Sequence, residues 1–386
     1  MKIEFISTIT IMPKFVTANL SNNAEPCILR YTTSDNEMIN IKAARFDAEI
    51  ISHIYNNGEG QIIFNKSIRM IGNWAFYDSN LTSIIIPNSV TQIGNCAFLG
   101  CCSLTGVTIP DRVTQIGDRA FYCCSRLTNI TIPNSVTEIG WETFSGCCSL
   151  TSVTIPNSVT EIGSNAFSRC SSLRSVSIPN SVTKIGDSAF SGCCNLTAFY
   201  GKFASAYNRC LIVDGVLNSF ASAGLTEYTI PNNVTEIGDR AFDGCSSLTS
   251  VIIPNSVTKI RDCAFYNCSS LISITIPNSV TEISSSAFYY CSRLTSVTIP
   301  NSITEIGSSA FSYCSSLISV TIPNRVTKIG MRAFSDCSSL QTIICKSTTP
   351  PILGDMAFLG IPSNATIIIP EGSEEAYANS DWRKAL

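Results

Sequence analysis

Cysteines carry the most reactive side chains of this chain, and most of them recur at a fixed spacing. Ten of the nineteen occupy one position of a 23-residue step: Cys101, Cys124, Cys147, Cys170, Cys193, Cys245, Cys268, Cys291, Cys314 and Cys337. Thiols can pair as disulfides, bind zinc or act as nucleophiles. However, the sequence holds no C-x-x-C pair, and its single histidine, His53, lies outside the recurring segment. A zinc site is therefore not indicated.

The regular cysteines are expected to form a column. Chain segments that pair as parallel strands lie about 4.8 Å apart, so adjacent Cα atoms fall close to disulfide range. Their side chains point in the same direction, which disfavours the bond. We therefore expect buried, reduced cysteines that pack as small apolar side chains. Four other cysteines are expected at the surface as free thiols: Cys102, Cys123, Cys148 and Cys194.

Charged residues follow the same periodicity and offer no catalytic group. A hydrolase with a nucleophile and a base needs a histidine or two converging carboxylates, whereas these charges are dispersed at the repeat spacing. One column follows the V-T dipeptide, or I-T in one copy: Gln92, Gln115, Glu138, Glu161, Lys184, Glu236, Lys259, Glu282, Glu305 and Lys328. It is either a charged recognition stripe or a solvated face with weak ion pairs. We expect neither enzymatic activity nor a cofactor or metal.

The glycines of the repeat do not form a phosphate-binding loop. The I-G dipeptide recurs singly, and Arg261 and Ser284 replace its glycine in two copies. This position is therefore not expected to require a positive φ angle.

The element that must position these side chains is a repeated 23-residue unit, most of which is LTSVTIPNSVTEIGSNAFSRC at 150–170. The proline of its I-P-N triplet recurs at Pro87, Pro110, Pro133, Pro156, Pro179, Pro231, Pro254, Pro277, Pro300 and Pro323. A constant period in the twenties, with apolar residues at fixed offsets, is typical of a leucine-rich-repeat solenoid in which each copy forms one coil.

Each position of the unit has a predicted role. The side chains expected in the core are Leu150, Val153, Ile155, Val159, Ile162, Ala166, Phe167 and Cys170. Those expected to face water from a short strand are Thr151, Ser152 and Thr154. Pro156 ends the strand because it cannot donate to a ladder, and a short helical or 3₁₀ turn is expected after Gly163. One coil alone buries too little apolar surface to offset the entropy of ordering it, so coils must stack.

The unit I-P-N-S-V-T-E-I-G-x-x-A-F-x-x-C-S-S-L-T-S-V-T, as at 155–177 with its own substitutions, resembles the repeats of BspA-type leucine-rich-repeat proteins over roughly 71–370. The resemblance implies an α/β repeat fold: a right-handed solenoid with a parallel β-sheet on one face and short helical or 3₁₀ turns on the opposite face. It also implies a bacterial cell-surface or secreted protein that mediates adhesion by binding host or microbial macromolecules.

Composition agrees with a long sheet covered by Ser, Thr and Asn. The chain is 45% hydrophobic and only 14% charged, with a net charge of -3. Lys and Arg are scattered singly, so no basic stripe for nucleic acid is present. No apolar run reaches the roughly 18 residues of a transmembrane helix.

The chain divides into four predicted parts. Residues 1–25 form either a flexible segment or a cleaved secretory signal, because the apolar stretch at 5–12 is short and interrupted by Ser and Thr. Residues 26–70 form a β cap of two hairpins, one pairing 27–33 with 37–41 and one pairing 50–55 with 61–64 around Asn57-Gly58. The solenoid occupies 71–370. Residues 371–386 form a C-terminal cap helix that starts at Ser373, and Tyr377, Trp382 and Leu386 are expected to cover the open end.

An island at 198–224 interrupts the array, since Pro179 and Pro231 are 52 residues apart. It contains a hairpin signal at 210–217. Its candidate binding residues are the aromatic side chains Phe199, Tyr200, Phe203, Tyr207 and Phe220. Two interpretations stay open: these rings bind a partner, or they only fill the dislocation in the stack.

The sheet face is the other candidate binding surface. Its copies of Thr151, Ser152 and Thr154 are nearly uniform, which suits a protein or an extended polymer with repeated contacts. A flat threonine lattice also matches ice in principle, although curvature should spoil the register. We predict a non-enzymatic adhesion or protein-binding protein, at the cell surface or secreted. The alternative is an intracellular structural or scaffold protein, which the weak N-terminal signal and the free thiols favour.

Overall fold

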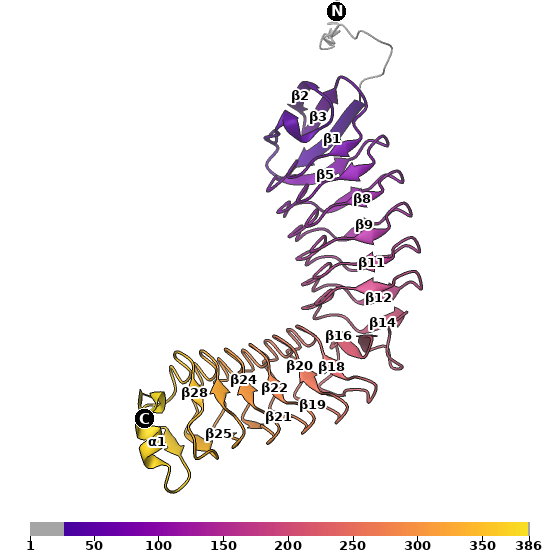
Figure 1. Cartoon of the computed structure of the whole chain (residues 1–386). Helices are drawn as coiled ribbons and strands as arrows, with labels where there is room; N and C mark the ends of the chain where they lie inside the picture. Colours follow the sequence, from indigo (N-terminus) through magenta and orange to yellow (C-terminus); the bar gives the residue numbers. More distant parts are fainter. Residues whose placement is uncertain (1–26, 385–386) are drawn as a thin grey trace, which may run out of the picture.

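A computed structural model describes residues 27–384. Figure 1 shows two straight stacks of coils that meet at a corner, which we call the elbow. The predictions for the signal or flexible segment at 1–25 and for Leu386 lie outside the described residues. Among those described, no helix is both long and apolar enough to cross a bilayer.

Most coils contribute a longer strand to the parallel ladders of the sheet face, whereas at 150–155 only an isolated bridge between Thr154 and Thr131 is present. In the first stack these strands are β5 (Leu81–Ile85), β7 (Gly106–Thr108), β9 (Asn129–Thr131), β12 (Ser175–Ile178) and β14 (Ala198–Gly201). In the second they are β17 (Glu227–Thr229), β19 (Ser250–Ile252), β21 (Ser273–Thr275), β23 (Ser296–Thr298), β25 (Ser319–Ile322), β27 (Thr342–Cys345) and β29 (Thr366–Ile368). Partners lie one repeat apart, as Ser250 pairs with Ser273.

A second ladder, which the sequence analysis did not predict, runs along what we call the short-strand face. In the first stack it consists of β4 (Met70–Ile71), β6 (Gln92–Ile93), β8 (Gln115–Ile116), β10 (Glu138–Ile139), β11 (Glu161–Ile162) and β13 (Lys184–Ile185). In the second it consists of β18 (Glu236–Ile237), β20 (Lys259–Ile260), β22 (Glu282–Ile283), β24 (Glu305–Ile306), β26 (Lys328–Ile329) and β28 (Ile352–Leu353).

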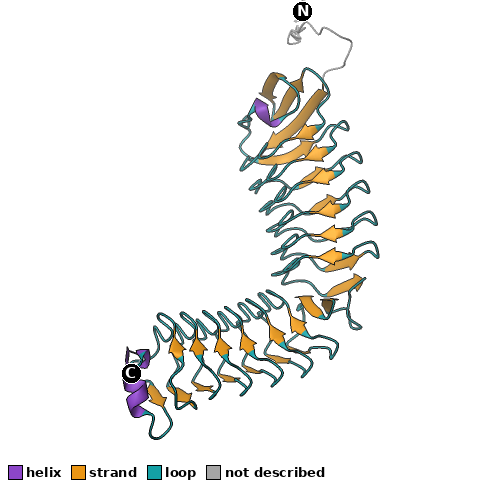
Figure 2. Cartoon of the chain, in the orientation of Figure 1, coloured by secondary structure: helices purple, strands orange, loops and turns teal. Residues whose placement is uncertain are grey.

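The third side of each coil, the turn face, is not helical, so the predicted helical or 3₁₀ turns are wrong. Figure 2 shows helix only at the two ends of the described chain. The backbone N–H of Phe167 donates to the carbonyl of Ala189 in the next coil at 2.8 Å, whereas the N–H of Ala166 donates back to Gly163. Residues such as Asn165, with φ 55°, interrupt any helical run. A helix would point all its N–H groups along its own axis, whereas this alternation also binds neighbouring coils together. The fold is thus a β-solenoid with almost no helix; the right-handed sense of its coils stays a prediction.

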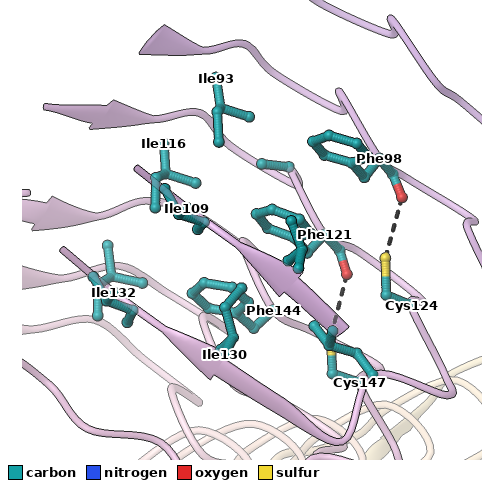
Figure 3. Packing of buried hydrophobic residues seen from close by; sticks show 14 of the residues in the cluster. Ile93, Phe98, Ile109, Ile116, Phe121, Cys124, Ile130, Ile132, Phe144 and Cys147 are labelled. Atoms are coloured by element: carbon teal, nitrogen blue, oxygen red, sulfur yellow. Dashed lines mark hydrogen bonds between the residues drawn. The ribbon is translucent and has the colours of Figure 1, made fainter. Parts of the chain in front are cut away.

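The core contains columns of identical side chains, in which each coil adds one residue to the column or file. Phe144, Phe167 and Phe190 lie one behind another, with successive ring centroids 5.3 Å apart and rings nearly parallel. Figure 3 shows the preceding part of the same file, Phe98, Phe121 and Phe144, with isoleucines beside it. This arrangement confirms the predicted stacking, in which each coil supplies part of the apolar surface that its neighbour buries.

The N-terminal end is closed by β1 (Cys27–Thr33), β2 (Ile50–Asn56), β3 (Glu59–Phe64) and the 3₁₀ turn η1 (Ala43–Arg45). The predicted hairpin of β2 and β3 around Asn57 is confirmed. The predicted pairing of β1 with 37–41 is wrong. Strand β1 lies between β3 and β5, antiparallel to both, so neither of its edges is left for that segment.

The C-terminal end is closed by α1 (Glu374–Ala378) and η2 (Asp381–Lys384). Tyr377 and Trp382 are fully buried, and the Trp382 ring lies 5.5 Å from that of Phe358 in the last coil. Both aromatic rings therefore cover the open end, as predicted. Ser373 precedes α1, but its hydroxyl donates to the carbonyl of Pro370 rather than capping the helix.

The elbow arises where the island is inserted. The predicted hairpin is present as β15 (Cys210–Val213) and β16 (Val216–Phe220), and β16 pairs in parallel with β18. On the turn face the two stacks contact each other directly, since the Ser188 hydroxyl of the first stack donates to the carbonyl of Asp239 in the second at 3.0 Å. The inserted hairpin separates the two stacks on one side, while they contact directly on the turn face. This difference in spacing accounts for the bend in Figure 1. The division of the chain into four parts stays a prediction.

Candidate functional site

Two of the five island aromatics belong to the core. Phe199 is fully buried and meets Phe190 edge to face at 5.6 Å. Phe220 is buried between Tyr228 and Phe242, at centroid distances of 4.5 and 4.7 Å. Neither ring is available to a partner, and both fill the dislocation between the stacks.

The other three island aromatics reach the surface to different degrees. Tyr200 is 48% exposed and Tyr207 is 83% exposed. Phe203 is half-buried, with the Nζ of Lys202 lying 5.0 Å from its ring centroid. The island therefore offers two exposed tyrosines to a partner rather than a cluster of five rings.

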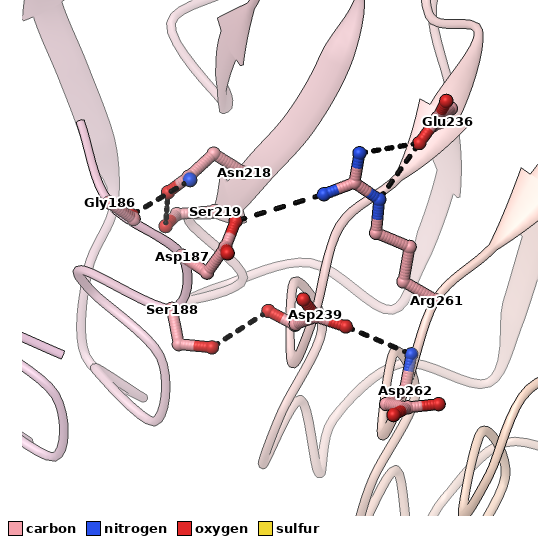
Figure 4. A network of polar contacts seen from close by, with 9 residues as sticks. All are labelled: Gly186, Asp187, Ser188, Asn218, Ser219, Glu236, Asp239, Arg261 and Asp262. Atoms are coloured by element: carbon pink, nitrogen blue, oxygen red, sulfur yellow. Dashed lines mark hydrogen bonds and ion pairs between the residues drawn. The ribbon is translucent and has the colours of Figure 1, made fainter. Parts of the chain in front are cut away.

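A polar network braces the elbow, as Figure 4 shows. The Asn218 amide donates to the carbonyl of Gly186 at 3.0 Å. The guanidinium of Arg261 bridges the two stacks, lying 2.6 Å from a Glu236 carboxylate oxygen and 3.8 Å from one of Asp187. These contacts link the two stacks at the elbow.

The elbow carboxylates have structural partners rather than a metal. Burial raises the pKa of Asp239, and the nearby Asp187 carboxylate raises it further. Asp239 also accepts the backbone N–H of Asp262 at 3.0 Å. Across residues 27–384, no three His, Cys, Asp or Glu side chains are grouped so as to hold a metal ion. Arg261 stands at the I-G position, whose glycines, Gly163 among them, do not adopt a positive φ, as predicted.

The ladder cysteines are free and buried, as predicted, and they also make a hydrogen bond. The thiol of Cys124 donates to the carbonyl of Phe98, at an Sγ to O distance of 3.2 Å. Burial raises the pKa of both Cys291 and Cys337 to about 12. Such thiols stay protonated at neutral pH and are poor nucleophiles. Cys102, Cys148 and Cys194 are exposed free thiols and Cys123 is half-buried.

The charged column lies on the short-strand face and contains ion pairs between neighbouring coils. Lys184 pairs with Glu161, and Lys328 pairs with Glu305 at 3.5 Å. All four side chains are partly exposed, so each pair contributes at most about 1 kcal/mol.

The sheet face is uniform, and one of its threonine columns is used in stacking. The hydroxyl of Thr128 donates to the carbonyl of Thr105 in the preceding coil at 3.1 Å, and Thr151 repeats this contact with Thr128. Ser152 and Thr154 stay exposed. A partner on this face would meet mostly small polar side chains, with exposed isoleucines such as Ile85 and Ile252 in some coils.

The turn face carries most of the differences between copies. They fall at the two residues before and the two residues after the A-F dipeptide. In the second stack these positions bring together four tyrosines, the tyrosine patch: Tyr266, Tyr289, Tyr290 and Tyr313. The sequence analysis missed this patch, although aromatic residues at the x-x positions of A-F-x-x-C are a visible signal.

Other large aromatics also lie on the turn face. Trp74 and Tyr77 are exposed and meet at 5.2 Å. In the first stack, the guanidinium of Arg119 lies 4.0 Å from the ring centroid of the exposed Trp141. The turn face thus combines sequence differences between coils with several exposed aromatic side chains.

Comparison with known proteins gives a consistent result. The sequence profile described as "BspA type Leucine rich repeat region (6 copies)" matches residues 27–147, 92–205, 217–341 and 305–380. None of the curated proteins matches the chain.

Solved structures share the fold. A leucine rich cell surface protein from Faecalibacterium prausnitzii A2-165 is 34% identical, with 82% of this chain and 94% of that chain covered and a TM-score of 0.63. A leucine-rich repeat protein from Eubacterium ventriosum ATCC 27560 is 23% identical, with 77% and 92% covered and a TM-score of 0.63. The pneumococcal vaccine antigen PcpA, at 16% identity, has a TM-score of 0.54 over 88% of each chain, which is a likeness of fold alone.

Proposed function

Because the chain belongs to the BspA-type leucine-rich-repeat family, we propose that it is a non-enzymatic binding protein that holds macromolecular partners at the cell surface. The partners are proteins or extended polymers of host or microbial origin, and the outcome is adhesion. The similar protein from Faecalibacterium prausnitzii is a cell surface protein, which supports this location.

The observation that carries the proposal is the placement of large aromatic side chains. Trp141, Tyr290 and Tyr313 are exposed on the turn face of a rigid stack, although the core aromatic files beside them are fully covered. Exposed aromatic groups of this size mark interaction surfaces, because burying them against a partner removes much apolar area from water. The exposed Tyr200 and Tyr207 and the sheet face would supply secondary contacts.

The proposal is tested on intact native cells with a membrane-impermeant cross-linker, followed by mass determination of the mature N-terminus. We expect labelling of the protein on intact cells, cross-links to one or a few macromolecules, and loss of the first residues. A chain that starts at Met1 and is labelled only after cell lysis would contradict the proposed location.

One observation favours the alternative of an intracellular scaffold. All nineteen cysteines are free, and Cys102, Cys148 and Cys194 among them are exposed. Such thiols persist most easily in a reducing or anaerobic setting. The same cell experiment separates the two functions, because a scaffold would be cross-linked only by a permeant reagent.

A further inference from the structure

The tyrosine patch is a continuous surface built from three consecutive coils. Tyr266 and Tyr289 stack at 5.1 Å, and Tyr290 and Tyr313 stack at 4.8 Å. Tyr289 joins the two pairs, since its ring lies 5.5 Å from Tyr290 and 5.4 Å from Tyr313. Tyr290 is 45% exposed and Tyr313 is 37% exposed. Tyr266 and Tyr289 are half-buried.

Two of these tyrosines occupy a backbone conformation that disfavours them. Tyr290 has φ 62° and Tyr313 has φ 60°, which is the left-handed region. The equivalent position has a positive φ in the other coils as well, whether it is glycine, as Gly100, or another residue, as Cys123 and Arg169. A bulky side chain there adds strain that glycine avoids. The turn imposes this conformation on every coil, and what sets the two tyrosines apart is their exposed aromatic area.

Two aromatic rings of the turn face are covered by guanidinium groups of the same chain. The guanidinium of Arg119 lies over Trp141 at 4.0 Å. The guanidinium of Arg240 lies 5.2 Å from the Tyr266 centroid and pairs with Asp243 at 3.3 Å. In the described part of the chain, no arginine or lysine lies over Tyr290 or Tyr313.

A carboxylate stands next to the unoccupied rings. Asp336 occupies the same position as Tyr313, one coil further on, and its Oδ2 accepts the hydroxyl of Ser335 at 2.7 Å. The nearest cation in the following turn, Arg332, is directed to the sulfur of Met356 at 3.6 Å. A guanidinium laid on Tyr313 would lie one coil from the Asp336 carboxylate, whose Oδ1 is on the side of Gly360 in the following coil.

We infer that Tyr290, Tyr313 and Asp336 form a docking site for a protein segment that presents arginine side chains. The inference rests on the proposed binding function. It places that function at the tyrosine patch and specifies a partner that is rich in arginine. Arginine suits this site because its planar cation stacks on aromatic rings and bonds to a carboxylate at the same time. A neutral polysaccharide fits less well, since it would bring no cation to the Asp336 carboxylate.

The test uses the full chain and a fluorescent peptide in which arginines are spaced by glycine and serine. Its control peptide carries citrulline, which keeps the shape and the N–H donors but lacks the charge. We expect the Tyr290→Gly, Tyr313→Gly double variant to bind the arginine peptide about tenfold more weakly, and Asp336→Asn to weaken binding several-fold. The citrulline peptide should bind weakly to every form. Met38→Ser, which changes an exposed apolar side chain of the N-terminal cap, is the control and should bind like the unchanged chain.

Thermal unfolding of the same variants separates binding from structure. Because glycine relieves the left-handed strain, the double variant should melt at the same temperature as the unchanged chain or higher. A marked fall in its melting temperature would assign the tyrosines a packing role and overturn the inference. Equal binding of both peptides, or binding of a neutral hexasaccharide in place of the arginine peptide, would overturn it as well. If the double variant gives the same cross-links on intact cells as the unchanged chain, the inference fails while the proposed function stands.

Discussion

The thiol of Cys147 donates a hydrogen bond to the carbonyl oxygen of Phe121, 3.2 Å away in the preceding coil. That oxygen also accepts the backbone N–H of Cys124, so it bonds both within its own coil and to the next coil. The contact recurs for most ladder cysteines, as in Cys170 with Phe144 and Cys314 with Phe288. Cysteine meets two demands here, because it is small and apolar enough for the core and still supplies a weak donor.

Substituting a ladder cysteine should therefore destabilise the stack. We expect Cys147→Ala to lower the free energy of unfolding by about 1 to 2 kcal/mol, because it removes the donor and leaves a small cavity. Denaturant unfolding followed by far-UV circular dichroism measures this change. Cys148→Ala is the matched control, since its thiol is exposed, and it should change stability by less than about 0.5 kcal/mol. Equal effects of the two substitutions would contradict the structural role of the ladder.

Alkaline pH should weaken the fold through the same thiols. Burial raises the pKa of Cys337 from an ordinary value of 9.0 to about 12. Between these values the unfolded chain loses protons that the folded chain retains, so the free energy of unfolding falls as pH rises. Urea midpoints at pH 8 and pH 11 measure the loss. Replacing both Cys291 and Cys337 by alanine should make the pH dependence shallower, and an unchanged slope would contradict this origin.

Thiol chemistry should distinguish the ladder from the surface. In the folded protein, iodoacetamide at pH 8 is expected to alkylate Cys102, Cys148 and Cys194, which are exposed, and to leave Cys170 unmodified. The ladder thiols are excluded by burial and by their raised pKa, as for Cys291. Peptide mass spectrometry before and after unfolding reads the pattern. Rapid native labelling of Cys170 would show that the coils do not pack as described.

The elbow should open when its buried amide is removed. Asn218 is buried, donates to Gly186 and accepts the hydroxyl of Ser219 at 2.9 Å. Asn218→Ala leaves both partners unsatisfied, so we expect a loss of about 1 to 3 kcal/mol. Small-angle scattering should report a broader distribution of interatomic distances. Arg261→Gly, which removes only partly exposed ion pairs, should lower stability by no more than about 1 kcal/mol. An Asn218→Ala protein as stable as the Arg261→Gly one would argue against the brace.

The C-terminal cap should matter far more than its short length suggests. Trp382 is fully buried over Phe358, and its indole N–H donates to the carbonyl of Pro351 at 2.8 Å. We expect Trp382→Ala to cost about 3 to 5 kcal/mol, because it uncovers the last coil. The exposed Tyr207 provides the control, and Tyr207→Ala should leave the unfolding midpoint unchanged.

The repeat predicted the stacking of this chain because packing is dictated locally. Ten copies place Phe and Cys at the same offsets, so files such as Phe144, Phe167 and Phe190 follow from the period alone. The turn face was mispredicted because A-F-x-x-C has helical spacing. Residues next to this motif, such as Asn165, instead adopt a positive φ, and their backbone N–H groups bond to the next coil.

The other features that the sequence analysis did not predict are ones that no repeat pattern encodes. A two-residue strand such as β22 (Glu282–Ile283) is too short for alternation to reveal it. Phe199 and Phe220 could not be separated from Tyr200 and Tyr207 by type, because burial at the elbow depends on how the two stacks meet. The tyrosine patch escaped prediction since its members come from three coils and meet only after stacking.

The account holds that partners are bound on the turn face, at the tyrosine patch. Hydroxyl-radical footprinting of the full chain, with and without the arginine peptide, tests this most directly because it reads exposed aromatic side chains one by one. We predict that the peptide protects Tyr290 and Tyr313 and leaves Tyr200 and Tyr207 unchanged. Protection of the two island tyrosines, with none at Tyr290 and Tyr313, would contradict the account.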